Sequence, residues 1–168
     1  MTKPSDRDES FSTFFSAHAE DMRRLAVFLT GDPEQRRDAA QEALVRTYRH
    51  WSRIKGEDPV PYTKRIVVNL VRSAHRRKIV AIRHAKSTPP DPGIQQSSAG
   101  KVDDWLVVSD ALLTLPPVRR AAIVMRYYED MSEADIARVL DRPLNTIKSD
   151  IHRGLKRLRP LLEEAVRT

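Results

Sequence analysis

The chain has 168 residues, of which 32% are charged and 40% hydrophobic, and its formal net charge of +7 at pH 7 favours nucleic acid as a partner. It contains no cysteine, which excludes a disulfide scaffold, a thiolate metal site and a cysteine nucleophile. The polar first ten residues and the lack of any stretch of about 18 apolar residues predict a soluble, cytoplasmic protein without membrane insertion, made of one ordinary domain or two small ones.

Proline and a polar segment divide the chain. Proline breaks helix interiors but is accepted in first turns, so the 11 prolines mark boundaries and the intervals between them read as helices. No alternating run bounded by hairpin signals occurs, which predicts an all-α fold. Residues 87–101 hold almost nothing to bury, which is typical of a flexible linker. We therefore expect a disordered tail (1–9), a helical domain (10–86), a linker (87–103) and a second helical domain (104–168).

The first domain is predicted to hold three helices, over about residues 10–30, 33–53 and 61–86. Asp32 suits an N-cap, with Pro33 at the first helical position and Gln35 placed to complete a capping box. At 100° per residue, one side of the second helix is an expected core stripe, made of Ala40, Ala43, Leu44, Thr47 and Trp51.

The opposite side of the second helix carries Asp38, Gln41, Glu42, Val45 and Arg49. A solvated polar face accounts for these residues by itself. In a basic protein, however, acidic groups gathered on one face also suit docking to a basic partner surface.

The third helix carries charges of one sign. Between Tyr62 and Lys86 there is no Asp or Glu, and Arg65, Arg72 and Arg76 recur at helical spacing together with Asn69. Such a stripe repels itself unless a polyanion is bound, which favours contact with nucleic acid over plain solvation. Tyr62 suits either the core or a stacked base.

The second domain reads as a helix-turn-helix. A capped helix over residues 132–140 is followed by a tight turn and an amphipathic helix whose apolar stripe begins at Ile147. The second helix of this motif enters the major groove near its N-terminal end. Its polar side carries Lys148, Ser149, His152 and Arg153, which can read base edges or neutralise phosphates.

These segments together resemble the extracytoplasmic-function type of bacterial sigma factors, the promoter-recognition subunits of RNA polymerase. Residues 38–43 (DAAQEA) are similar to the family's acidic motif for docking the clamp of the largest polymerase subunit. Residues 61–70 (PYTKRIVVNL) are similar to its −10 helix, and residues 115–159 follow its −35-reading domain. The C-terminal pattern alone is also found in other DNA-binding regulators, whereas the ordered combination is more specific.

The resemblance implies a role for each surface. Core RNA polymerase would bind Asp38, Gln41, Glu42 and Val45. The −10 element would bind Tyr62, Arg65, Asn69, Arg72 and Arg76, with an unstacked base cradled by the loop at residues 56–61. The −35 element would bind Thr146, Lys148, Ser149, Asp150, His152 and Arg153. The resemblance also implies that an anti-sigma factor is a potential partner.

Three positions depart from the family pattern, one of them Asn145, which stands where glycine is common. Asp141 stands in a turn where glycine is usual, but Asp tolerates a left-handed conformation better than most residues. Asp150 stands where Arg is common in the reading helix. Its carboxylate would repel phosphate, but it could accept a hydrogen bond from cytosine N4.

The sequence offers no catalytic motif. Its five histidines show no metal-ligand spacing, and no phosphate-binding glycine loop or nucleophile elbow occurs. We therefore expect no metal, no cofactor and no enzymatic activity. Two alternatives to a sigma factor stay open: a stand-alone helix-turn-helix regulator, and a nucleic-acid-processing enzyme with its site in the basic third helix.

Overall fold

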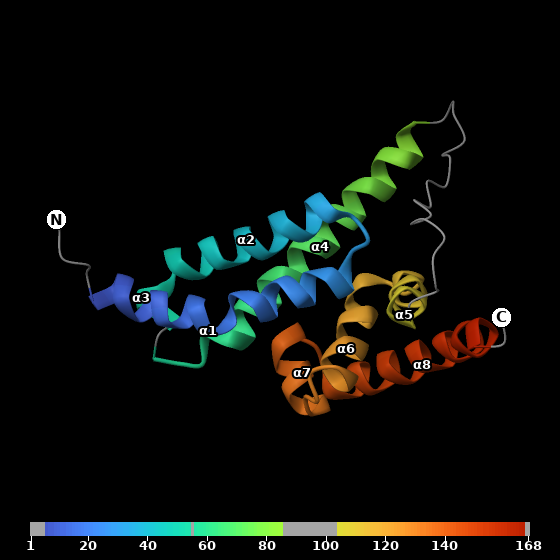
Figure 1. Ribbon diagram of the computed structural model, residues 1–168. Coiled ribbons are helices and arrows are strands. Elements are labelled where there is room, and N and C mark those ends of the chain that lie inside the picture. Colours follow the sequence, from blue (N-terminus) through green and yellow to red (C-terminus); the bar gives the residue numbers. More distant parts are fainter. Residues whose placement is uncertain (1–5, 55, 86–103, 167–168) are drawn as a thin grey trace.

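The computed structural model describes residues 6–54, 56–85 and 104–166, and within these ranges every element is a helix (Figure 1). The all-α prediction is therefore confirmed, whereas the expected linker at 87–103 lies outside the described residues. The helices are α1 (Asp6–Leu29), α2 (Pro33–Arg49), α3 (Trp51–Ile54), α4 (Pro59–His84), α5 (Asp104–Leu113), α6 (Pro117–Tyr127), α7 (Glu133–Leu140) and α8 (Leu144–Val166).

The starts of α2 and α4 follow from their capping residues. Asp32 Oδ1 accepts hydrogen bonds from the backbone N–H groups of Glu34 (2.9 Å) and Gln35 (3.2 Å), as the sequence predicts. Gln35 does not complete a capping box, because its side-chain oxygen instead accepts from the Thr30 hydroxyl. Asp58 caps α4 in the same way by accepting from the Val60 N–H, so that helix begins at Pro59, two residues before the expected start.

The first and second helices differ from the prediction at one end each. α1 begins at Asp6 rather than near Ser10, and the acidic residues of its first turn suit the positive end of the helix dipole. α2 ends at Arg49, because the chain turns at His50 and starts the separate short helix α3 at Trp51.

α1, α2 and α4 pack together into a first helical group, and the whole predicted core stripe, from Ala40 of α2 to Trp51 of α3, is buried in it. Inside this group the Thr47 and Thr63 hydroxyls are hydrogen-bonded to each other (2.9 Å). Each hydroxyl also lies 2.8 Å from a carbonyl oxygen one turn earlier on its own helix, that of Ala43 for Thr47 and that of Pro59 for Thr63. Both buried hydroxyls therefore have hydrogen-bond partners.

α5 to α8 form a second helical group, and α7, the turn and α8 make the predicted helix-turn-helix. The Ser132 hydroxyl caps α7 by accepting from the Asp135 N–H (3.1 Å). Asp141 ends the helix with φ 52° and ψ 55°, which confirms the left-handed conformation expected at this turn. From α8, Ile147, Ile151 and Leu158 enter the core.

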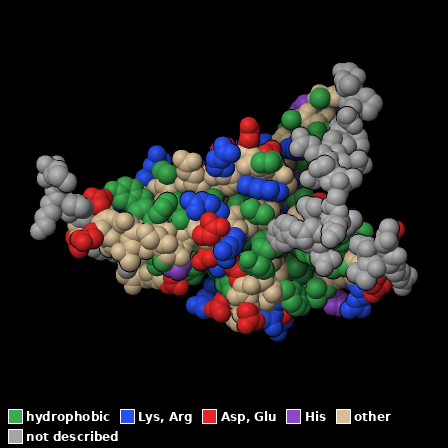
Figure 2. All heavy atoms as spheres, viewed as in Figure 1, with side chains coloured by type: hydrophobic (Ala, Val, Ile, Leu, Met, Phe, Trp, Pro, Cys, Tyr) green, Lys and Arg blue, Asp and Glu red, His purple; other side chains and the backbone are tan. Residues whose placement is uncertain are grey.

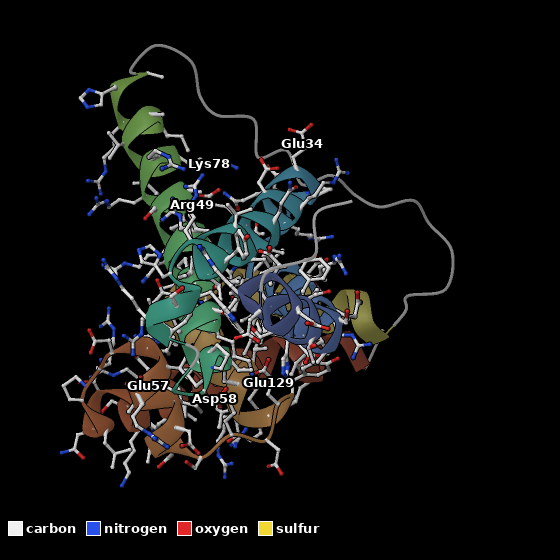
Figure 3. The ribbon with its side chains drawn as sticks, turned by 90° about the vertical axis from the view of Figure 1, so that its left-hand side faces the viewer. Glu34, Arg49, Glu57, Asp58, Lys78 and Glu129 are labelled. Carbon is white, nitrogen blue, oxygen red and sulfur yellow. The ribbon has the colours of Figure 1, made fainter. Side chains whose placement is uncertain are left out.

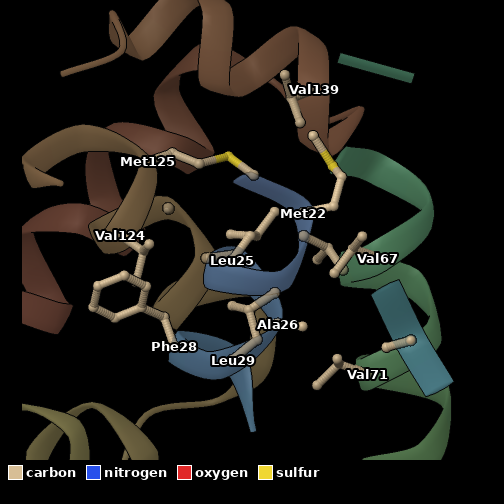
Figure 4. Packing of buried hydrophobic residues seen from close by; sticks show 14 of the residues in the cluster. Met22, Leu25, Ala26, Phe28, Leu29, Val67, Val71, Val124, Met125 and Val139 are labelled. Atoms are coloured by element: carbon tan, nitrogen blue, oxygen red, sulfur yellow. The ribbon is translucent and has the colours of Figure 1, made fainter. Parts of the chain in front are cut away.

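The two helical groups also pack against each other and share one apolar core. Figure 4 shows Met22 and Leu25 of α1 and Val67 of α4 gathered with Met125 of α6 and Val139 of α7. Farther along α1, the rings of Phe28 and Tyr128 lie 4.4 Å apart between centroids. The sequence predicted two helical groups but contained no indication that they would meet.

A buried arginine links the two groups. Arg120 of α6 is 4% exposed, and its guanidinium donates to carbonyls at the ends of α1 and α5. Its acceptors are the carbonyl oxygens of Leu29, Leu112, Leu113 and Leu115. Burial lowers the pKa of Arg120 to about 10, which leaves it protonated at neutral pH. The cation therefore supplies donors to carbonyls at the ends of α1 and α5 and in the turn that follows α5.

Candidate nucleic-acid interface and docking surface

The acidic face of α2 points away from the core. Asp38, Gln41 and Val45 are exposed and Glu42 is half-buried, so all four residues predicted to bind polymerase lie on one accessible surface. Glu42 accepts a hydrogen bond from Arg46 Nε (2.6 Å), which partly neutralises its charge. Asp38 is exposed on this face, as is Arg49 at its far end.

An apolar groove of about 730 Å³ adjoins this face, between α1 and α2. Gln41 and Val45 line it together with Phe15, Leu44 and Tyr48. On the side seen in Figure 2, apolar side chains reach the surface beside these helices among charged groups. The sequence analysis did not predict the groove, although Phe11 and Phe15, spaced four residues apart on the first helix, were a signal for it.

Three contacts from the first turn of α1 fix Tyr48 in the wall of the groove. The Tyr48 hydroxyl donates to Asp8 (2.5 Å), and that hydrogen bond raises the pKa of Tyr48. Arg7 lies over the ring at 4.5 Å from its centroid and donates to the Tyr48 carbonyl (2.6 Å). The first turn of α1 thus fixes the ring beside the docking residues.

The basic face of α4 is accessible over most of its length. Asn69, Arg72 and Arg76 are all exposed, and the C-terminal part of the helix, which carries Lys78, extends beyond the helical body (Figures 1 and 3). Tyr62 is half-buried, with its ring 6.4 Å from that of His50. A strand of nucleic acid can therefore approach the middle and far end of the predicted stripe.

The near end of the stripe is occupied by the second helical group. Arg65 Nε donates to the Val139 carbonyl (2.8 Å), and its terminal nitrogen donates to the Arg138 carbonyl. The neighbouring Lys64 forms an ion pair with Glu129, with Nζ and Oε2 2.5 Å apart. Arg65 is thus the one predicted −10 residue whose cation already has acceptors within the protein.

The first half of α8 presents the predicted reading face. Lys148, Ser149, His152 and Arg153 are exposed and Thr146 is half-buried in the first turn. Asp150 lies differently, because its carboxylate faces α6 and pairs with Arg119 Nε at 3.1 Å. The structure therefore groups five of the six predicted −35 residues at the surface and places the sixth against the supporting helix.

Two kinds of feature are lacking in the described part of the chain. No group of three or more His, Cys, Asp or Glu side chains there could hold a metal ion. None of the helices described is long and apolar enough to cross a membrane.

Comparisons with known proteins identify the family of this chain. A family model described as Sigma-70 region 2 matches residues 14–79, and one described as Sigma-70, region 4 matches residues 106–158. The RNA polymerase sigma-E factor of Streptomyces avermitilis is 32% identical over 158 residues, which cover 91% of this chain and 85% of that protein. The ECF RNA polymerase sigma factor SigL of Mycobacterium tuberculosis is 32% identical over 160 residues, covering 89% and 87%. The chain belongs to the extracytoplasmic-function RNA polymerase sigma factors.

Solved structures show that the sigma factor shares its fold with other members of the family. The sigma factor RpoE of Bartonella quintana, solved in complex with the anti-sigma factor NepR, matches 92% of this chain and 98% of its own with a TM-score of 0.72 and 21% identity. CnrH, solved in complex with the cytosolic domain of CnrY, gives a TM-score of 0.64 with 19% identity. All the predicted site residues of this sigma factor fall inside the two ranges matched by the family models.

Proposed function

We propose that this sigma factor docks on core RNA polymerase through α2, contacts the −10 element through α4 and reads the −35 element through α8. The observation that carries the proposal is the separation of charge on one chain. An accessible acidic face on α2 stands apart from an acid-free basic face on α4 and from a polar and basic face on α8. The acidic face suits a basic protein surface, and the other two suit a polyanion.

The residues at each surface take roles that follow from their chemistry. Asp38, Gln41, Glu42 and Val45 would bind the polymerase clamp. Asn69, Arg72 and Arg76 would hold a strand near an unstacked base, whose unstacking costs a few kcal/mol that contacts of this kind must offset. On α8, Arg153 and Ser149 would read base edges while Lys148 neutralises phosphate.

Catalysis in this proposal belongs to the polymerase, and the sigma factor acts wherever that enzyme and the promoter meet, in the cytoplasm. We also propose that an anti-sigma factor binds this chain, as one does in the RpoE complex. The apolar groove between α1 and α2 supports this part of the proposal, since it gives a regulator a surface beside the docking residues.

Co-purification with core polymerase, followed by transcription from genomic fragments, tests the proposal. The combined variant Asp38→Ala, Gln41→Ala, Glu42→Ala should lose polymerase binding. A control with the same change in charge, Asp21→Ala with Glu163→Ala on exposed acids of α1 and α8, should keep it. A stand-alone regulator would ignore polymerase in every form, and an enzyme would turn over RNA or DNA by itself.

A further inference from the structure

We propose that the contact between α4 and the helix-turn-helix half is an autoinhibitory latch that withholds the near end of the −10 surface until the two halves separate. The proposal rests on the −10 role proposed for α4. In this latch two adjacent cations of α4, Lys64 and Arg65, bind either the protein or DNA, but not both at once.

The Lys64–Glu129 ion pair is the first part of the latch. The two side chains are only 11% and 13% exposed, and Lys64 Nζ also lies 3.9 Å from the Met131 sulfur (Figure 3 labels Glu129). An ammonium group covered to this extent cannot reach a phosphate. A charge that is left unpaired in a covered site is strongly disfavoured. Removing either partner therefore destabilises the closed arrangement of the two helical groups.

Arg65 is the second part. It donates to the carbonyls of Arg138 and Val139, which belong to the last turn of α7. The last turn of a helix carries the negative end of the helix dipole, and among the described residues the Arg138 carbonyl accepts only a long hydrogen bond from the Asp141 N–H (3.4 Å) besides the one from Arg65. The end of α7 therefore presents to Arg65 the kind of acceptor that a DNA backbone would present, and the two compete for the same guanidinium.

The latch leaves the other surfaces open. Arg72 and Arg76 farther along α4 are exposed, as are the docking residues of α2 and the reading face of α8. The closed chain can thus meet polymerase and carries an accessible −35 helix, while the first cations of the −10 helix are unavailable.

Promoter geometry gives the reason for opening. Elements at −35 and −10 are centred about 25 base pairs apart, or ~85 Å along B-DNA. In the closed chain, Arg65 of the −10 helix touches the end of α7, and α7 packs directly on α8, whose 23 residues extend ~35 Å. Since the closed chain cannot span both elements, the halves must part before both are read.

The test compares two substitutions of equal charge in the full chain. Glu129→Gln removes the partner of Lys64, whereas Glu133→Gln removes a carboxylate from the first turn of α7 without touching the latch. With single-stranded oligo(dT) as the probe, we expect Glu129→Gln to bind about tenfold more tightly than wild type, because breaking a pair covered on both sides shifts a two-state equilibrium by a decade or more. The control should change less than about twofold. Equal gains in the two variants would overturn the latch.

A distance measurement separates the latch from the −10 role. Because the chain has no cysteine, spin labels can be placed specifically at exposed positions of α1 and α7 through Ala17→Cys and Ala134→Cys. We expect one short distance in the wild type, a longer one in Glu129→Gln, and the short one restored when Lys64→Glu is combined with Glu129→Lys. An unchanged distance in Glu129→Gln overturns the latch, and longer distances without tighter DNA binding overturn the −10 role of this end of α4.

Discussion

Asp150 is the predicted −35 residue that forms an ion pair with α6, and replacing it gives a sharp test. Its carboxylate lies 3.1 Å from Arg119 Nε, with the two side chains 16% and 25% exposed. At an effective dielectric constant of about 20, charges this far apart attract by roughly 5 kcal/mol, and the partial desolvation of both groups offsets most of that. We expect Asp150→Ala to lower the free energy of unfolding by about 1–2 kcal/mol, since the pair is neither fully exposed nor fully buried.

Urea denaturation measures the coupling energy between Asp150 and Arg119 when four proteins are compared: the wild type, Asp150→Ala, Arg119→Ala and the double variant. The coupling energy from this cycle should be about 1–2 kcal/mol. Binding to a panel of −35 sequences should change uniformly, because Asp150 supports α8 rather than reading a base. A coupling energy below about 0.3 kcal/mol, together with altered preference at a single base position, would show that Asp150 reads DNA and that its contact with Arg119 contributes nothing.

Three further outcomes follow from the described contacts. Arg72→Ala and Arg76→Ala should each lower the slope of log K against log salt for single-stranded DNA by about 0.7, and an unchanged slope would remove that residue from the −10 surface. Arg120→Met should lower the free energy of unfolding by about 3 kcal/mol in urea, because four carbonyls lose a charged donor, and a loss below 1 kcal/mol would contradict its role as the link between the halves. The hydrogen bond from the Ser132 hydroxyl lowers the pKa of Asp135, so the stability it gives is present above the unfolded pKa and is lost as pH falls through the lower folded one. Asp135→Asn should therefore be less stable than wild type at pH 7, and the difference should vanish as the pH falls and the carboxyl of the wild type becomes protonated; a difference that persists in acid would contradict this assignment.

Features set by neighbouring residues were predictable from the sequence. The Asp32 cap before Pro33, the buried stripe of α2 and the left-handed Asp141 depend on chemistry within a turn or two of the chain. The break between α2 and α3 was not predicted, because Trp51 continues the apolar spacing of α2. The chain leaves the helix at His50 (φ −101°, ψ 6°), and the Trp51 indole N–H then donates to Ser10 of α1 (2.8 Å).

Features set by distant residues were not predictable from periodicity. The basic stripe on α4 was visible in the sequence, but its pattern cannot tell which cation finds an acceptor inside the protein. Arg65 meets carbonyls 73 and 74 residues away, and Lys64 meets a carboxylate 65 residues away. In the same way, the family resemblance implied that Asp150 faces the −35 element, while its partner lies on α6, 31 residues earlier.

Gly154 shows how a residue that looks unsuitable by local rules is required by packing. Replacing glycine by alanine inside a helix ordinarily stabilises it by about 1 kcal/mol. Here a Cβ would lie 3.0 Å from two carbons of the Ile123 side chain and 3.3 Å from Arg119 Cγ, so α6 and α8 approach too closely for it. We expect Gly154→Ala to lower the free energy of unfolding by about 1–3 kcal/mol, as overpacked cores do.

The same substitution has a natural control and a rescue. Nothing lies within 4 Å of a Cβ at Gly56, so Gly56→Ala should be neutral or stabilise by up to about 1 kcal/mol. Adding Ile123→Val to Gly154→Ala removes one of the crowding carbons and should recover part of the lost stability, although Ile123→Val alone costs about 1 kcal/mol. If Gly154→Ala proved as stable as wild type, or if the second substitution only added its own cost, the close approach of α6 to α8 could not be what requires glycine at the centre of the reading helix.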